Sequence, residues 1–239
     1  MPIDSRLIEY HDGDTRCEGF FVADAHTDRP LPAVLIAHTW AGRNAFVEAK
    51  ARQLAGQGYA ALALDMYGDG RTGSSPEECA QLMSPFLENR SRLQARIQAA
   101  LDCLREQPEV DAQKIAAMGF CFGGLCVLDL ARSGADLQGI VSFHGLLTPP
   151  ETSPDSPIKP RILILHGFDD PMAPPDQAIA LGRELTDRGA DWQIHLFGNT
   201  VHAFTNPDAN DPGLGTVYDA AADRRSWRYL MDFLDEVLD

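Results

Sequence analysis

A glycine-rich stretch near the middle of the chain surrounds one cysteine. Gly119–Gly124 reads G-F-C-F-G-G, follows an apolar run at Ile115–Gly119 and precedes the helical pattern L-C-V-L-D-L-A-R. A sharp strand-to-helix turn strains its central residue, and glycines two residues before and after it avoid steric clashes. A helix N-terminus also favours a thiolate over a thiol. The spacing therefore predicts that Cys121 is a nucleophile; the alternative is a small, inert core cysteine.

A thiol nucleophile needs a base, and the base needs an orienting carboxylate. His202 comes soon after the last predicted strand, where a base is expected. Asp170 follows another predicted strand, and Asp169 beside it fits the pattern equally well. The chain order of nucleophile, acid and base is that of the α/β-hydrolase triad.

The other histidines near predicted strands have less specific contexts. His38 and His144 lie at strand ends, where they either line the site or cap the strands. His166 and His195 lie on or beside strands and are interpreted as structural. Because His166 and Asp170 lack any recognised metal-ligand spacing, no metal site is predicted.

Backbone N–H groups are expected to hold the negative oxygen of the transition state. One predicted donor is Phe122, directly after the nucleophile, and the other is Trp40 in the loop after the apolar run Ala33–Ala37. The predicted lining of an apolar substrate pocket is Thr39, Phe86, Phe168 and Phe204. Ordinary core packing is the alternative for the three aromatic residues.

These residues need a scaffold in which strands alternate with helices. Apolar runs predict strands at 33–37, 60–64, 115–119, 140–143 and 161–165, and the alternating stretch 192–197 predicts a sixth. Continuous apolar runs are typical of strands covered on both faces, and helical patterns fill the gaps between them. The sequence therefore predicts an α/β fold, with a mostly parallel, doubly wound sheet and helices on both faces. The length favours a single domain over residues 1–239.

Composition excludes several classes of partner. The 239 residues include 35 acidic and 20 basic side chains, a net charge of −15. Such a field repels a phosphate backbone and an anionic bilayer, so neither nucleic-acid nor membrane partners are expected. The five cysteines are odd in number and lack a C-x-x-C pair, which disfavours a disulfide framework or zinc ribbon. Without an apolar signal segment or a membrane-length apolar run, a cytoplasmic location is expected.

The chain resembles the dienelactone hydrolase family of α/β-hydrolases over nearly its whole length. The motifs that carry this resemblance are G-F-C-F-G-G (119–124), H-G-F-D-D-P-M-A-P (166–174) and H-A-F (202–204). The framework stretches H-T-W-A-G (38–42), D-M-Y-G-D-G (65–70) and A-D-R-R-S-W (222–227) also look similar. The resemblance implies that Cys121 is the nucleophile, His202 the base and Asp170, rather than Asp169, the orienting carboxylate.

Two positions depart from the family pattern. Well-known members carry a glutamate just after the third strand and an arginine four residues after the catalytic histidine, where this chain has Thr39 and Asn206. The glutamate helps to set the resting state of the cysteine, and the arginine binds the substrate carboxylate. The resemblance therefore extends to the triad but not to specificity for an anionic dienelactone.

The predicted activity is hydrolysis of a carboxylic ester or lactone through a thioester on Cys121, without a cofactor. The expected partner is a small-molecule substrate, and the protein is expected to be a monomer or a small homo-oligomer. A ligand-binding or sensor protein on the same fold is one alternative, because fold alone does not determine function. A redox pair of Cys121 and Cys126 is another.

Overall fold

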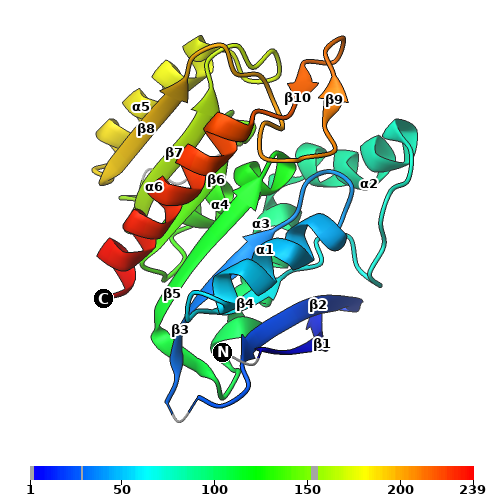
Figure 1. The fold of residues 1–239 in the computed structure, drawn as a ribbon, viewed down its shortest axis with the longest axis vertical. Coiled ribbons are helices and arrows are strands. Elements are labelled where there is room, and N and C mark those ends of the chain that lie inside the picture. Colours follow the sequence, from blue (N-terminus) through cyan, green and yellow to red (C-terminus); the bar gives the residue numbers. More distant parts are fainter. Residues whose placement is uncertain (1–2, 28, 152–155) are drawn as a thin grey trace. The chain divides into compact units, whose positions relative to one another are not determined.

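The computed structural model describes residues 3–27, 29–151 and 156–239 (Figure 1). Its contacts divide the chain into two compact units, Met1–Ala117 and Met118–Asp239, which are described separately. The single domain expected from the length stays a prediction.

The first unit begins with a hairpin and continues with parallel strands. Its strands are β1 (Ile3–Asp12), β2 (Thr15–Asp24), β3 (Leu31–Ala37), β4 (Ala60–Ala63) and the greater part of β5 (Val110–Phe120). β1 pairs antiparallel with β2, β2 antiparallel with β4, and β4 parallel with β3. The apolar side chains of Ala33–Ala37 are all buried, as continuous apolar runs in parallel strands require.

Helices of the first unit begin at well-defined caps. They are α1 (Ala45–Ala55), α2 (Pro76–Glu88) and α3 (Arg90–Arg105). The side chains of Asn44, Ser75 and Asn89 each accept a hydrogen bond from a backbone N–H in the first turn of the helix that follows. α1 packs on β2 and β4, and α3 packs on β1 and β3.

The second unit contains the end of β5 and three parallel strands. These are β6 (Gly139–Phe143), β7 (Arg161–Gly167) and β8 (Trp192–Phe197), with β7 in the middle. A short antiparallel hairpin follows, formed by β9 (Asn210–Asp211) and β10 (Thr216–Val217).

Helices of the second unit cover both faces of its strands. They are α4 (Phe122–Arg132), α5 (Pro175–Asp187) and α6 (Ala220–Leu238). Within this unit, Figure 1 shows α6 passing in front of β6 and β7, with α4 behind them. α5 packs on β8. None of the described helices is long and apolar enough to cross a membrane.

The prediction of an α/β fold with a mostly parallel sheet and covering helices is confirmed. All six predicted strands are present, within a few residues at most of their predicted ends except for β5, which starts five residues earlier. The hairpin of β1 and β2 is not among the predicted strands. Most side chains of β1 are at least partly exposed, so the strand lacks the apolar run that marks the others.

Candidate active site

Cys121 lies at a strained turn between β5 and α4. Its backbone has φ 55° and ψ −116°, values that a residue with a side chain rarely adopts. Its N–H donates to the carbonyl of Phe143 at 3.0 Å. A side chain at position 119 would overlap the carbonyl of Gly123, so the turn requires glycine there. The half-buried Cys121 side chain thus lies at the N-terminus of α4, where the helix dipole favours negative charge.

The tight turn gives a stability prediction. Replacing Gly119 with alanine is expected to destabilise the protein by about 2–3 kcal/mol, because the new methyl group meets backbone rather than a flexible side chain. Thermal unfolding should then show a Tm lower by roughly 4–12 °C. Gly198→Ala is the matched control, since no atom lies within 4 Å of the added carbon. Equal Tm values for the two variants would contradict the proposed steric requirement.

His202 is fixed by its backbone as well as by its side chain. Its N–H donates to the carbonyl of Gly215 at 2.9 Å, and its carbonyl accepts from the N–H of Val217 at 3.1 Å. The residue is buried. The next residue, Ala203, has a positive φ of 58°, which turns the chain away after the histidine.

Asp170 binds and orients the His202 ring. Its Oδ2 accepts from Nδ1 of His202 at 2.7 Å, while Oδ1 accepts from the backbone N–H groups of Met172 and Ala173 at 2.8 and 3.3 Å. Asp169 is exposed, and its N–H donates to the carbonyl of Thr200. Of the two aspartates that fitted the sequence pattern, the structure therefore brings Asp170 to the histidine.

The charge state of His202 depends on its two partners. Burial by itself would lower the pKa of this ring, but the charge of Cys121 and the hydrogen bonds with Asp170 and Cys121 raise it to about 10. Nδ1 of His202 is bonded to Asp170, which leaves the buried Nε2 as the ring nitrogen that can exchange a proton with Cys121. At neutral pH the His202 ring is therefore protonated.

Two more buried histidines surround this group. The ring of His144 lies edge-on to the His202 ring, with centroids 5.1 Å apart, and its Nε2 is 2.8 Å from Oγ1 of Thr205. His166 donates from Nε2 to the carbonyl of Ala173 at 2.7 Å. Burial lowers the pKa of His166, so its ring is uncharged at neutral pH.

His144 has a structural role that sequence reasoning left open. It follows β6 with a positive φ of 37°, and its N–H donates to the carbonyl of Leu165. The hydrogen bond to Thr205 ties the end of β6 to the loop that carries His202. Its position at a strand end was the available signal, but the contact itself depends on a residue 61 positions away.

The remaining predicted residues of the second unit have different surroundings. Phe122 is the first residue of α4 and is buried. Phe204 is also buried, with its ring 5.1 Å from His144 and 5.5 Å from Phe197. Phe168 is 47% exposed just after β7. Only Phe168 therefore offers a large accessible apolar surface, and Phe204 supports the His144 ring.

The first unit holds the other three predicted site residues. Thr39 accepts at Oγ1 from the N–H of Ala41 at 3.3 Å. The carbonyl of Trp40 accepts from the Tyr67 hydroxyl at 2.7 Å, and the ring of the buried Phe86 lies 5.9 Å from the Tyr67 ring. Tyr67 therefore links the loop after β3 with α2 inside this unit. The oxyanion and pocket roles of these residues stay predictions.

Comparison with known proteins places the chain in a family. The sequence pattern of the dienelactone hydrolase family matches residues 18–238. The chain belongs to the dienelactone hydrolase family. This confirms the resemblance seen in the sequence, and the protein is accordingly an enzyme of a hydrolase family.

Solved structures and curated relatives agree with this membership. A dienelactone hydrolase-like promiscuous phosphotriesterase from metagenomic libraries is 39% identical, with a TM-score of 0.96 and full coverage of both chains. A putative dienelactone hydrolase from Klebsiella pneumoniae has a TM-score of 0.83 at 20% identity, covering 98% of this chain and 99% of its own, and so supports the fold alone. A putative carboxymethylenebutenolidase from Aquifex aeolicus is 24% identical over 98% of this chain and 99% of its own length.

Proposed function

We propose that this dienelactone hydrolase family member cleaves carboxylic esters or lactones with Cys121 as nucleophile, His202 as proton carrier and Asp170 as orienting carboxylate. The observation that carries the proposal is the buried contact of Asp170 and His202 at 2.7 Å, together with the interaction of the same ring with Cys121. Such a chain of three groups is the arrangement by which a weak nucleophile is activated.

The first half of the proposed reaction forms a thioester. The sulfur of Cys121 attacks the substrate carbonyl carbon, whose oxygen takes the negative charge. When the carbonyl re-forms, the C–O bond to the leaving group breaks, and the imidazolium of His202 gives its proton to the departing oxygen. The products of this half are an alcohol, or the opened hydroxyl end of a lactone, and a thioester on Cys121.

The second half reverses these roles with water. In the thioester the sulfur carries no charge, so one cause of the raised pKa of His202 disappears. The ring, now neutral, takes a proton from water as the water oxygen attacks the thioester carbonyl. The C–S bond then breaks, releasing the acid and restoring the thiolate beside the imidazolium. Asp170 keeps the ring in the same orientation throughout.

We further propose that the oxyanion is held by the backbone N–H groups of Phe122 and Trp40. Phe122 begins α4, so its N–H lies at the positive end of the helix dipole. The Tyr67 hydroxyl fixes the peptide carbonyl of Trp40. Each such donor contributes roughly 3 kcal/mol to lowering the barrier in comparable sites.

The proposed substrate is uncharged around its reacting group. Asn206 stands where an arginine binds the substrate carboxylate in well-known relatives, and its side-chain oxygen accepts from the N–H of Asp208 at 3.1 Å. This position therefore offers no cation to an anionic substrate. The net charge of −15 also disfavours carboxylate-bearing substrates.

A substrate panel tests the proposal. Short p-nitrophenyl esters and small neutral lactones should be turned over, with kcat/KM at least about tenfold higher than for carboxylate-bearing lactones of similar size. A phosphotriester belongs in the panel because the 39% identical relative is described as a promiscuous phosphotriesterase. Intact-mass measurement during turnover should show an acyl group added to the enzyme, mapped to Cys121. If no compound is hydrolysed and no adduct forms, the ligand-binding alternative replaces this proposal.

A further inference from the structure

The outermost strand of the second unit lacks the usual protection of a sheet edge. β8 reads W-Q-I-H-L-F and contains no acidic residue, lysine, arginine, proline or glycine. Burial lowers the pKa of His195 in this strand, so its ring is uncharged at neutral pH. β1, the outermost strand of the first unit, reads I-D-S-R-L-I-E-Y-H-D and carries four charged side chains. Charged side chains normally keep an exposed edge strand from pairing with another chain, and β8 lacks them.

The outer backbone groups of β8 are directed away from β7. The carbonyls of Asp191 and Phe197 accept from Ile162 and Phe168 of the β7 side, both at 2.9 Å. Alternate residues of a strand direct their backbone groups to opposite sides. The N–H and carbonyl groups of positions 192, 194 and 196 therefore face outward, and no strand among the described residues pairs with this edge.

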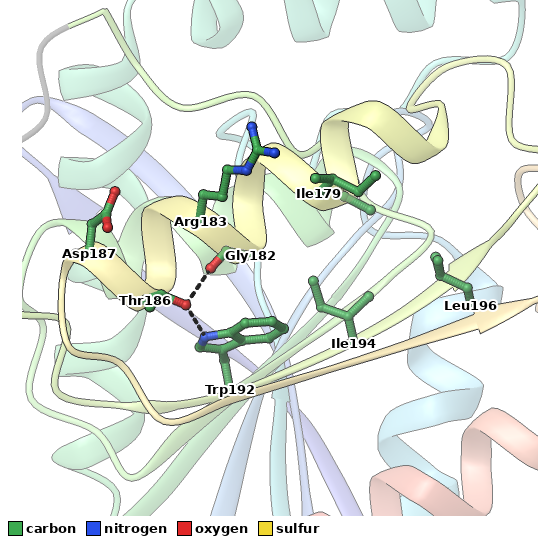
Figure 2. Close-up of a pocket in the computed structure, with 9 residues that line it drawn as sticks. Ile179, Gly182, Arg183, Thr186, Asp187, Trp192, Ile194 and Leu196 are labelled. Carbon is green, nitrogen blue, oxygen red and sulfur yellow. Dashed lines mark hydrogen bonds between the residues drawn. The ribbon is translucent and has the colours of Figure 1, made fainter.

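An apolar groove runs beside this edge (Figure 2). It has a volume of about 600 Å³ and lies between α5 and β8. Ile179 and Leu196 at its rim are 54% and 42% exposed. Its floor is held firmly, because Nε1 of Trp192 donates to Oγ1 of Thr186 at 3.2 Å and the same hydroxyl donates to the carbonyl of Gly182 at 2.8 Å.

The exposed side of α5 has a charge pattern that is complementary to itself. Asp176, Ile179 and Arg183 are spaced three and four residues apart, which places them along one face of the helix. An acidic residue thus lies on one side of an exposed isoleucine and a basic residue on the other. Two such helices that meet antiparallel at Ile179 bring each aspartate opposite an arginine.

We propose that a second copy of this chain binds here, with the two β8 strands antiparallel about a twofold axis and the two α5 helices side by side. The outward N–H and carbonyl groups of β8 in each copy then form hydrogen bonds with those of the other copy. The two grooves join, so that Ile179 and Leu196 of both copies are buried together. Asp176 of each copy pairs with Arg183 of the other, as an isologous interface requires.

A second copy explains these features together. β8 carries no acidic or basic side chain in a protein with a net charge of −15, so pairing along it brings no like charges of the two strands together. The opposite charges of Asp176 and Arg183 on the two sides of Ile179 are both matched when the partner helix is a second copy in the reverse direction. A different protein or a small ligand in the groove would not require that symmetry.

Sedimentation equilibrium of the full chain tests the proposal. At micromolar concentration and physiological salt, the mass should be twice the 26.1 kDa of one chain. Leu196→Lys places a charge on the edge and should raise the dissociation constant at least about tenfold. Leu7→Lys is the matched control, because Leu7 is 55% exposed on β1, and its dimer should be unchanged. Circular dichroism checks that both variants are folded.

Charge reversal tests the orientation. Arg183→Glu should weaken the dimer, and adding Asp176→Lys to it should restore much of the lost affinity, because the ion pair is re-formed in reverse. A wild-type protein that is monomeric under these conditions overturns the proposal. So does a dimer that ignores Leu196→Lys or is broken equally by Leu7→Lys. A double variant no tighter than Arg183→Glu alone overturns the antiparallel helix contact.

Discussion

Cys121→Ala is expected to lower kcat/KM for the best ester of the panel by about 10,000-fold or more. The variant keeps the fold, His202 and Asp170, but no atom remains that can attack the carbonyl. Cys121→Ser should recover little of this activity. No thiolate then raises the pKa of His202, and a serine hydroxyl is a far weaker acid than a thiol. Initial rates with purified enzyme, checked for folding by circular dichroism, measure both effects.

Cys126→Ala provides the control for this experiment. Cys126 is buried in α4 and has no place in the proposed reaction, so its replacement should leave kcat/KM within about twofold of the wild type. A redox pair would instead require both thiols. Activity that survives in Cys121→Ala would overturn the nucleophile assignment, and equal losses in the two alanine variants would favour the redox alternative.

Asp170→Asn is the second change with a large expected effect. The amide presents a hydrogen-bond donor or a weak acceptor to Nδ1 of His202 in place of a carboxylate at 2.7 Å, so kcat should fall by about 100- to 10,000-fold. Asp169→Asn is the neighbouring control, because that side chain is exposed and should change kcat by less than about twofold. A larger loss at Asp169 would reverse the assignment.

The same pair of variants has a pH signature. The pKa of His202 is raised to about 10, so the ring is protonated through neutral pH and loses its proton only as the pH rises past that value. The profile of kcat/KM reports the free enzyme and should therefore decline on the alkaline side near pH 10. Asp170→Asn removes two of the interactions that raise the pKa, and its alkaline limb should move to lower pH. An unchanged limb in this variant would contradict the ion-pair assignment.

The pattern of apolar residues along the sequence predicts the strands that are buried in the sheet. The runs at 33–37 and 161–165 are apolar because their strands are largely buried, and both are strands in the structure. β1 was missed because it is mostly exposed and has no regular apolar pattern: polar side chains such as Arg6 and Glu9 occur along its whole length. Its pairing with β2 depends on the turn at Gly13, where φ is 56°. Such a strand is specified by its partner more than by its own sequence.

For the candidate site, the spacing of the motifs predicted the turn at Cys121 and the order of the three site residues along the chain. The turn at Cys121 and the meeting of Asp170 with His202 agree with what the motifs indicate. The sequence left open whether His144 lines the site, because its contact with the His202 ring depends on a positive φ and on a hydrogen bond across 61 residues. The exposure of the predicted pocket residues does not follow from the motifs either. Phe168 is half exposed and Phe204 is fully buried, although both adjoin motif residues.

The backbone hydrogen bonds of His202 involve only one part of the β9–β10 hairpin, so its two parts tolerate sequence changes differently. Its stem, at Gly215 and Val217, holds the histidine by two hydrogen bonds. Its tip, residues 212–214, forms no backbone hydrogen bond with His202: the N–H of Leu214 donates to Asp211, and the carbonyl of Pro212 accepts from Gly215. Sequence changes or grafted loops at residues 212–214 therefore leave the two backbone hydrogen bonds of His202 in place, and the proposed catalytic centre is kept while the tip diversifies.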